Sequence, residues 1–93
     1  MQLEITKRAR RNLDSIGEHY YRIGGSALAR KMIARIKEPF QQLLNFPYSA
    51  PVYKYKPTLR CLVVADGLFI IFYRIEQAVI EIVHIRRAEQ DLL

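Results

Sequence analysis

The chain has 93 residues, of which 51% are hydrophobic and 26% are charged, and it contains only 4 Gly and 4 Pro. This length fits one domain, and the composition excludes a disordered or low-complexity chain. The formal net charge of +6 favours acidic partners, namely nucleic acid, an acidic protein segment or an anionic membrane.

The sequence gives no sign of a disulfide, a metal site or a cofactor site. Cys61 is the single cysteine, so an internal disulfide is excluded, and no Cys/His set has zinc-ligand spacing. The uncharged apolar run at residues 67–73 is far shorter than the roughly 18 residues that span a bilayer. Charges from Glu4 to Arg11 interrupt any signal peptide. We therefore expect a cytoplasmic protein, held by packing alone, that has no membrane partner.

The N-terminal half predicts a short strand followed by a helical hairpin. Residues 1–6 alternate apolar and polar side chains, and Thr6 can cap the helix that follows. Steps of 3 and 4 place one apolar stripe on this helix: Ala9, Leu13, Ile16, Tyr20 and Ile23. Gly24 and Gly25 end it, and a second helix buries Leu28, Met32, Ile36, Phe40 and Leu43.

Proline then shapes the middle of the chain. Pro39 removes a backbone donor, so we expect a kink at Glu38 or a break with a short third helix that begins at Pro39. Residues 45–57 contain three prolines and show no hydrophobic period, which indicates a loop.

The C-terminal third predicts a three-stranded meander over residues 59–65, 68–75 and 79–85. Asp66-Gly67 is a strong hairpin signal, and it pairs Arg60 with Tyr73. A second two-residue turn would place Phe69 opposite His84 and Tyr73 opposite Ile80. The predicted fold is therefore α+β, in the order β-α-α-β-β-β, with a helical hairpin on one face of a mainly antiparallel sheet and one domain over residues 1–93.

Both faces of this sheet are apolar, and the helices can cover only one of them. With Arg60 and the arginines after the last strand at its edge, an uncovered apolar face predicts a protein partner. We expect Arg86 and Arg87 to lie beyond the strand and to reach solvent.

Three features could carry chemistry, and each has an ordinary structural alternative. His84 is either an acid/base group or a packed histidine at a strand end. Arg86-Arg87 either binds a phosphate or an acidic peptide, or is an exposed basic end without a role. Lys54-Tyr55-Lys56 suits a nucleic-acid backbone, although such loops are usually solvated.

Four segments in this order resemble the RelE/ParE superfamily of bacterial type II toxin–antitoxin toxins. They are residues 9–16 (ARRNLDSI), residues 57–60 (PTLR), residues 69–75 (FIIFYRI) and residues 83–87 (VHIRR). The resemblance covers essentially the whole chain. It implies a toxin that inhibits bacterial growth and is neutralised by a cognate antitoxin, which we expect to be acidic and partly helical.

The superfamily has two modes of action, and the resemblance leaves both open. RelE-like toxins are ribosome-dependent mRNA endonucleases, and ParE-like toxins poison DNA gyrase without being enzymes. In a nuclease, the matching residues here would be Lys54, Lys56, His84 and Arg87. The nuclease arginine of the middle strand falls on Phe69 or Ile70, and no tyrosine follows Tyr73 to supply the C-terminal one.

The late His-x-Arg-Arg therefore favours the ParE-like mode over the nuclease, and a non-toxic binding module on the same fold is the third alternative. The resemblance then implies a docking surface for the target or the antitoxin, with the C-terminal tail as a docking element. The residues we expect there are Arg60, Tyr73, His84, Arg86 and Arg87. We expect gyrase as the target, with the ribosome as the alternative.

Overall fold

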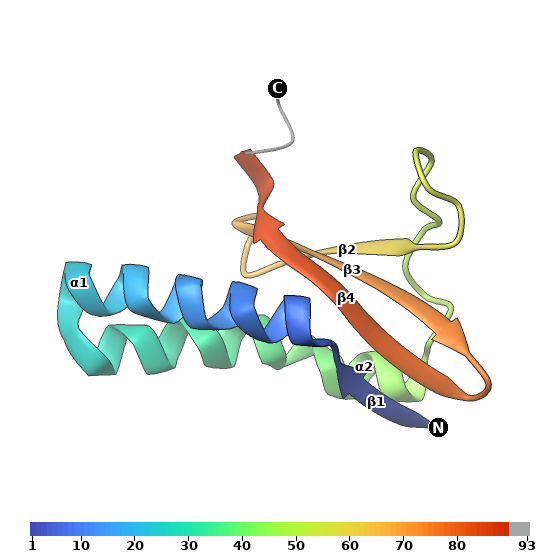
Figure 1. The fold of residues 1–93 in the computed structure, drawn as a ribbon, viewed down its shortest axis with the longest axis horizontal. Helices are drawn as coiled ribbons and strands as arrows, with labels where there is room; N and C mark the ends of the chain where they lie inside the picture. Colours follow the sequence, from blue (N-terminus) through green and yellow to red (C-terminus); the bar gives the residue numbers. More distant parts are fainter. Residues whose placement is uncertain (90–93) are drawn as a thin grey trace.

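A strand, a helical hairpin and a three-stranded meander follow one another in the computed structural model, which describes residues 1–89 (Figure 1). The elements are β1 (Gln2–Ile5), α1 (Lys7–Lys37), α2 (Pro39–Asn45), β2 (Arg60–Val64), β3 (Phe69–Glu76) and β4 (Val79–Arg87). The sheet has the order β1-β4-β3-β2, with β1 parallel to β4 and the other pairs antiparallel. The predicted α+β fold and its order of elements are confirmed.

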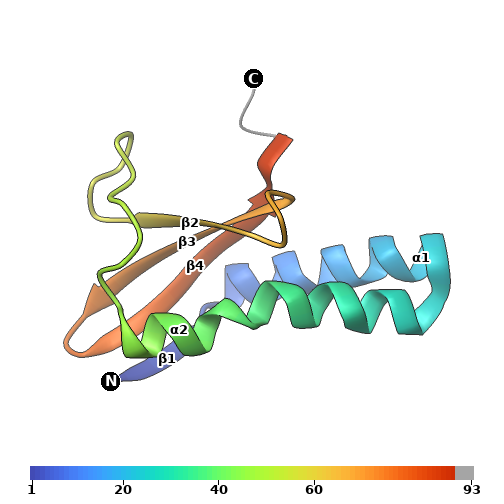
Figure 2. The same ribbon diagram turned by 180° about the vertical axis from the view of Figure 1, so that it is seen from behind.

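Helix α1 is itself a hairpin of two arms. Gly24 and Gly25 leave helical geometry, and Gly25 has φ +80°, a left-handed value that side chains with a Cβ rarely adopt. The two arms run side by side along one side of the sheet and project past it (Figures 1 and 2). The turn predicted at these two glycines is therefore present, and α2 begins at Pro39 as expected.

The core lies between the helices and the inner face of the sheet. The fully buried large side chains are Ile36, Leu43, Phe69, Ile71, Tyr73, Ile80, Ile82 and Ile85. Ile23 is an exception to the predicted apolar stripe, because it is 63% exposed. It lies beside the turn of the hairpin, where α1 has passed the edge of the sheet.

No helix among residues 1–89 is long and apolar enough to cross a membrane.

The first turn of the meander keeps the predicted register, but the second does not. Arg60 pairs with Tyr73 and Val64 with Phe69, as expected. The second turn consists of Gln77 and Ala78, both with positive φ, and it pairs Glu76 with Val79. The predicted partner of Tyr73 was wrong because the turn begins one residue later in the chain than expected. The predicted partner of Phe69 was wrong because of this turn and of a register shift further along β4.

A β-bulge then changes the faces of β4. Phe72 pairs with His84 but the next residue, Tyr73, pairs with Ile82, so Val83 is an extra residue on β4. Since side chains alternate along a strand, one extra residue reverses every side chain that follows it. Ile85 therefore faces the core, where it is 2% exposed, and His84 lies on the other face. The sequence predicted the opposite assignment.

The sequence predicted that the second face of the sheet is uncovered. In the structure a loop covers part of it. Tyr53, from the loop between α2 and β2, packs edge-to-face on Phe72 with ring centroids 4.9 Å apart. Phe72 is consequently 3% exposed, although Val63 on β2 remains 57% exposed. The loop thus covers the centre of the face and leaves apolar surface near β2.

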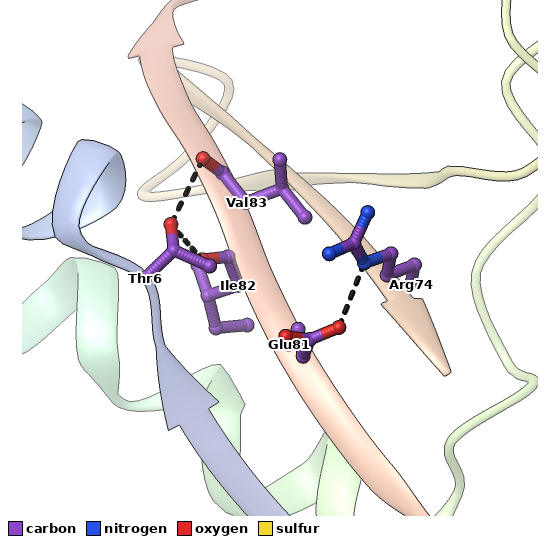
Figure 3. A network of polar contacts seen from close by, with 5 residues as sticks. All are labelled: Thr6, Arg74, Glu81, Ile82 and Val83. Carbon is purple, nitrogen blue, oxygen red and sulfur yellow. Dashed lines mark hydrogen bonds and ion pairs between the residues drawn. The ribbon is translucent and has the colours of Figure 1, made fainter. Parts of the chain in front are cut away.

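Thr6 joins β1, α1 and β4 (Figure 3). Its Oγ1 accepts the N–H of Ala9 at 3.2 Å, which confirms the predicted helix cap. The same hydroxyl lies 2.9 Å from the carbonyl oxygen of Ile82, to which it donates, and 3.2 Å from that of Val83.

On the outer face of the sheet, Arg74 donates to Glu81 at 2.7 Å across β3 and β4.

Replacing Thr6 by valine should destabilise the protein more than replacing an exposed threonine. Thr6→Val keeps the shape but removes the cap and the bond to Ile82, and loss of a cap alone costs about 0.5–2 kcal/mol. Thr58→Val, in the exposed loop, should change the free energy of unfolding by less than about 0.5 kcal/mol. Urea denaturation measures both, and equal midpoints would show that Thr6 does not hold this junction.

Candidate functional site

The basic end of β4 is the first candidate site, and its two arginines face opposite ways. The strand runs through Arg87, so neither arginine lies beyond it, contrary to the sequence prediction. Arg86 pairs with Ile70 and Arg87 with Phe69. Because Phe69 faces the core and Ile70 the outer face, Arg87 lies on the helix side of the sheet and Arg86 on the other.

On the outer face, Phe72 is the centre of an aromatic and cationic cluster. The guanidinium carbon of Arg86 lies 4.8 Å from the centre of the Phe72 ring. His84 stacks on the same ring, with centroids 5.9 Å apart and an angle of 23° between the planes. Arg86 is therefore half-buried by packing, and such a cation–π contact contributes about 0.5–2 kcal/mol.

Asn12 of α1 fixes the backbone and the histidine at this end of β4. Its Oδ1 accepts the backbone N–H of Ile85 at 3.0 Å and lies 2.9 Å from Nδ1 of His84. Since the Ile85 amide can only donate, the atom it meets is an oxygen, and Nδ1 of His84 must donate as well. His84 is therefore held by Asn12 and Phe72 together.

On the helix side, Arg87 opens onto a shallow pocket of about 200 Å³ between α1 and the ends of β3 and β4. Its polar lining residues are Asn12, Ser15, His19, Arg86 and Arg87. The apolar lining comes from Ile16, Tyr20, Phe69 and Ile85. The Arg87 side chain is 47% exposed and lies 3.4 Å from a carboxylate oxygen of Glu89. The pocket joins a helix face to the basic end of the sheet.

Arg60 and Tyr73 hold the loop between α2 and β2. Arg60 donates to the carbonyl oxygens of Ala50 at 2.7 Å and Tyr48 at 3.3 Å. The Tyr73 hydroxyl donates to the carbonyl oxygen of Pro47 at 2.8 Å, and burial raises the pKa of this phenol above its ordinary value. Tyr73 has no exposed surface, so it offers no contact to a partner that docks from solvent.

The lysines proposed for a nuclease lie in a loop and not at the end of β4. Lys54 and Lys56 are exposed in the loop that precedes β2, and the ammonium of Lys54 lies 4.9 Å from the centre of the Tyr55 ring. This loop joins β2 at Arg60, whereas Arg87 pairs at the opposite end of β3, with Phe69 (Figure 1). The residues described contain no group of three or more His, Cys, Asp or Glu that could hold a metal ion.

Sequence reasoning placed the arginines at a site but missed the residues of α1. Asn12 was not identified, although it contacts both Ile85 and His84. The available signal was the spacing of the polar residues Asn12, Ser15 and His19, which repeat at helical intervals beside the apolar stripe. The tail proposed as a docking element lies outside the described residues from position 90 onward.

Comparisons with known proteins agree with this fold. Residues 3–92 match a family model described as the ParE toxin of the type II toxin–antitoxin system parDE. A solved structure of a chromosomal ParDE toxin–antitoxin system from P. aeruginosa superposes with a TM-score of 0.79 at 29% sequence identity. That match covers 94% of this chain and 95% of the other. A comparison with curated proteins gives no match.

Stability at high pH should depend on Tyr73. Because its pKa is raised above 10.0 in the folded state, its contribution is complete below about pH 10 and is lost as the pH rises through the folded pKa. Tyr73→Phe should lower the free energy of unfolding at pH 7 by about 1 kcal/mol, through loss of the bond to Pro47. It should also flatten the fall in stability as the pH rises above about 10.

The matched control for this test is Tyr55→Phe, because Tyr55 is 75% exposed. Denaturant unfolding at several pH values should show the wild-type pH dependence for this control. If Tyr73→Phe loses stability with rising pH as steeply as the control, Tyr73 does not carry the alkaline transition.

Proposed function

The chain belongs to the ParE toxin family of type II toxin–antitoxin systems, and on this basis we propose that it stops bacterial growth by poisoning DNA gyrase. A cognate antitoxin, encoded with the toxin, neutralises it. In this proposal the protein is not an enzyme. It holds gyrase in the state in which DNA is cleaved, so its active part is a docking surface in the cytoplasm.

One observation carries the choice of gyrase over mRNA: the residues of the nuclease are incomplete and dispersed. The position of the middle-strand arginine holds Phe69, which is 1% exposed, or Ile70, and no tyrosine follows Tyr73 in the sequence. Lys54 and Lys56 lie in the loop before β2, away from the strand end that carries Arg87. General acid–base catalysis needs its groups within hydrogen-bond reach of one phosphate.

The basic end of β4 is the surface we propose for the target. Arg87 is exposed on the helix side, and the Arg86 guanidinium packs against the Phe72 ring, on which His84 also stacks. Packing holds the Arg86 side chain in place, so it loses less conformational freedom on binding than a mobile arginine. Arg60 donates its hydrogen bonds to loop carbonyl oxygens. We therefore propose that it positions the loop and does not contact the target directly.

The antitoxin should match the apolar and basic surface of the outer face. Val63 of β2 is 57% exposed, and the neighbouring loop exposes Phe46, Tyr48 and Tyr55 by 62%, 64% and 75%. An amphipathic, acidic segment that is partly helical and partly extended would bury these apolar groups and place carboxylates near Arg86 and the loop lysines. The mRNA endonuclease remains the second candidate, because Lys54 and Lys56 are both exposed.

The target can be tested directly with purified components. We expect the protein to cause gyrase-dependent cleavage of plasmid DNA and to leave mRNA on translating ribosomes intact. Gel analysis of the plasmid and primer extension on the mRNA measure the two outcomes. Cuts in ribosome-bound mRNA, with gyrase activity unaffected, would contradict the proposal and favour the nuclease.

The contribution of Arg87 can be separated from folding. Arg87→Ala should change stability by no more than about 0.5 kcal/mol, because the side chain is exposed. At a docking interface, loss of a buried charge pair costs about 2–5 kcal/mol, so toxicity on expression should fall strongly. Arg30→Ala, an exposed arginine on the second arm of α1, is the control and should stay toxic. Equal toxicity of two folded variants would remove Arg87 from the mechanism.

A further inference from the structure

Among residues 1–89, the pocket at Arg87 is lined by hydrogen-bond donors and by no carboxylate. Ser15, His19 and Arg87 each bring an N–H or O–H to its rim, and none of the nine described lining residues is Asp or Glu. Asn12 belongs to the same set, because its Oδ1 already accepts from both Ile85 and His84. The Asn12 NH₂ group, which only donates, is therefore the part of this side chain that a ligand can contact. These groups favour a ligand that accepts hydrogen bonds, and with the positive charge of Arg87 an anion fits best.

Arg87 supplies the charge, and its orientation follows from the bulge at Val83. Its pairing with Phe69 brings it to the helix side, where it lines the pocket together with Tyr20. Within residues 1–89, the Arg87 side chain forms an ion pair with Glu89 at 3.4 Å, and 71% of the Glu89 side chain is exposed. An exposed ion pair of this kind contributes little to stability, so an anionic ligand can replace Glu89 at small cost.

The pocket also lies on a basic stripe along the first arm of α1. Counting in steps of 3 and 4, the exposed residues of the stripe are Arg8, Arg11, Ser15, His19 and Arg22. From Arg8 to Arg22 the helix rises about 21 Å, at about 1.5 Å per residue. Arg22 pairs with Glu18 at 3.1 Å. Asp14 and Glu18 line a separate groove with Arg10 and Lys37.

We propose that this pocket and the stripe bind the phosphate backbone of double-stranded DNA. A single carboxylate would satisfy the pocket but would leave the arginines at positions 8 and 11 unused. DNA presents phosphates about 3.4 Å apart along the axis of each strand, so a 21 Å stripe can follow roughly six of them. The net charge of +6 favours the same polyanion.

This proposal rests on the gyrase proposal and extends it, since the toxin would bind DNA directly in the cleavage complex. The binding itself needs no gyrase, so the two proposals fail separately. A protein that binds DNA in this way but does not affect gyrase would refute only the target. One that poisons gyrase without any affinity for DNA would refute only the phosphate site.

The experiment is fluorescence anisotropy of a labelled 20-base-pair duplex with the full-length protein at several salt concentrations. We expect a dissociation constant of about 10⁻⁴–10⁻⁶ M, in the range of non-specific DNA binding, that weakens steeply with salt. Arg87→Ala and His19→Ala should each weaken binding roughly threefold to tenfold. Arg87→Ala should also lower the slope of log K against log salt by about 1.

The matched control is Arg10→Ala, which also removes one positive charge, from the arm of α1 that carries the stripe but from the separate groove. We expect it to weaken binding less than either test variant. If Arg10→Ala weakens binding as much as Arg87→Ala, only the net charge matters and the site is refuted. Ser15→Ala, a small change at an exposed position, keeps the test valid if the His19 variant does not fold.

Two further probes decide between DNA and other anions. A polyglutamate peptide of similar charge and a single-stranded RNA of similar length replace the duplex in the same assay. Binding of the peptide with no affinity for the duplex would overturn the proposal in favour of an acidic protein partner. Binding of the RNA alone would overturn it in favour of a ribosomal or messenger RNA ligand. Preference for the duplex, lost in Arg87→Ala, supports it.

Discussion

The hydrogen bond from the Ile85 amide to Asn12 is the interaction on which the candidate site depends. Strand β1 ends at Ile5, so beyond Ile82 the edge of β4 has no neighbouring strand among residues 1–89. Thr6 satisfies the carbonyl oxygen at the last paired position, and Asn12 accepts the Ile85 N–H on the far side of the bulge. A buried amide without a partner would cost about 1–3 kcal/mol, so this side chain holds the strand end in its register.

That register gives the two arginines separate surroundings. Arg86 packs on Phe72 beside His84, on the face that the loop with Tyr53 partly covers. Arg87 turns toward α1 and completes a pocket of hydrogen-bond donors. A toxin with this geometry can use two sides of one strand end. Under the gyrase proposal, both sides of the strand end contact the target, and the antitoxin also covers the apolar surface of the outer face.

The sequence predicted the elements well because their signals are local. Thr6 as a helix cap, the glycine turn of α1, the break at Pro39 and the Asp66-Gly67 hairpin each depend on a few neighbouring residues. The faces of β4 could not be predicted, because the bulge at Val83 depends on contacts between distant segments. The same holds for the cover of Phe72 by Tyr53 and for the role of Asn12.

The most direct test is gyrase-dependent DNA cleavage by a folded Asn12→Ala variant, in which both arginines are intact. If the orientation of the β4 end creates the active surface, this variant should cleave far less DNA with gyrase than the wild type. Faster hydrogen exchange at the Ile85 amide should accompany the loss and show that the strand end has loosened. Full gyrase poisoning by the folded variant, with the Ile85 amide exchanging fast, would contradict the dependence of function on this interaction.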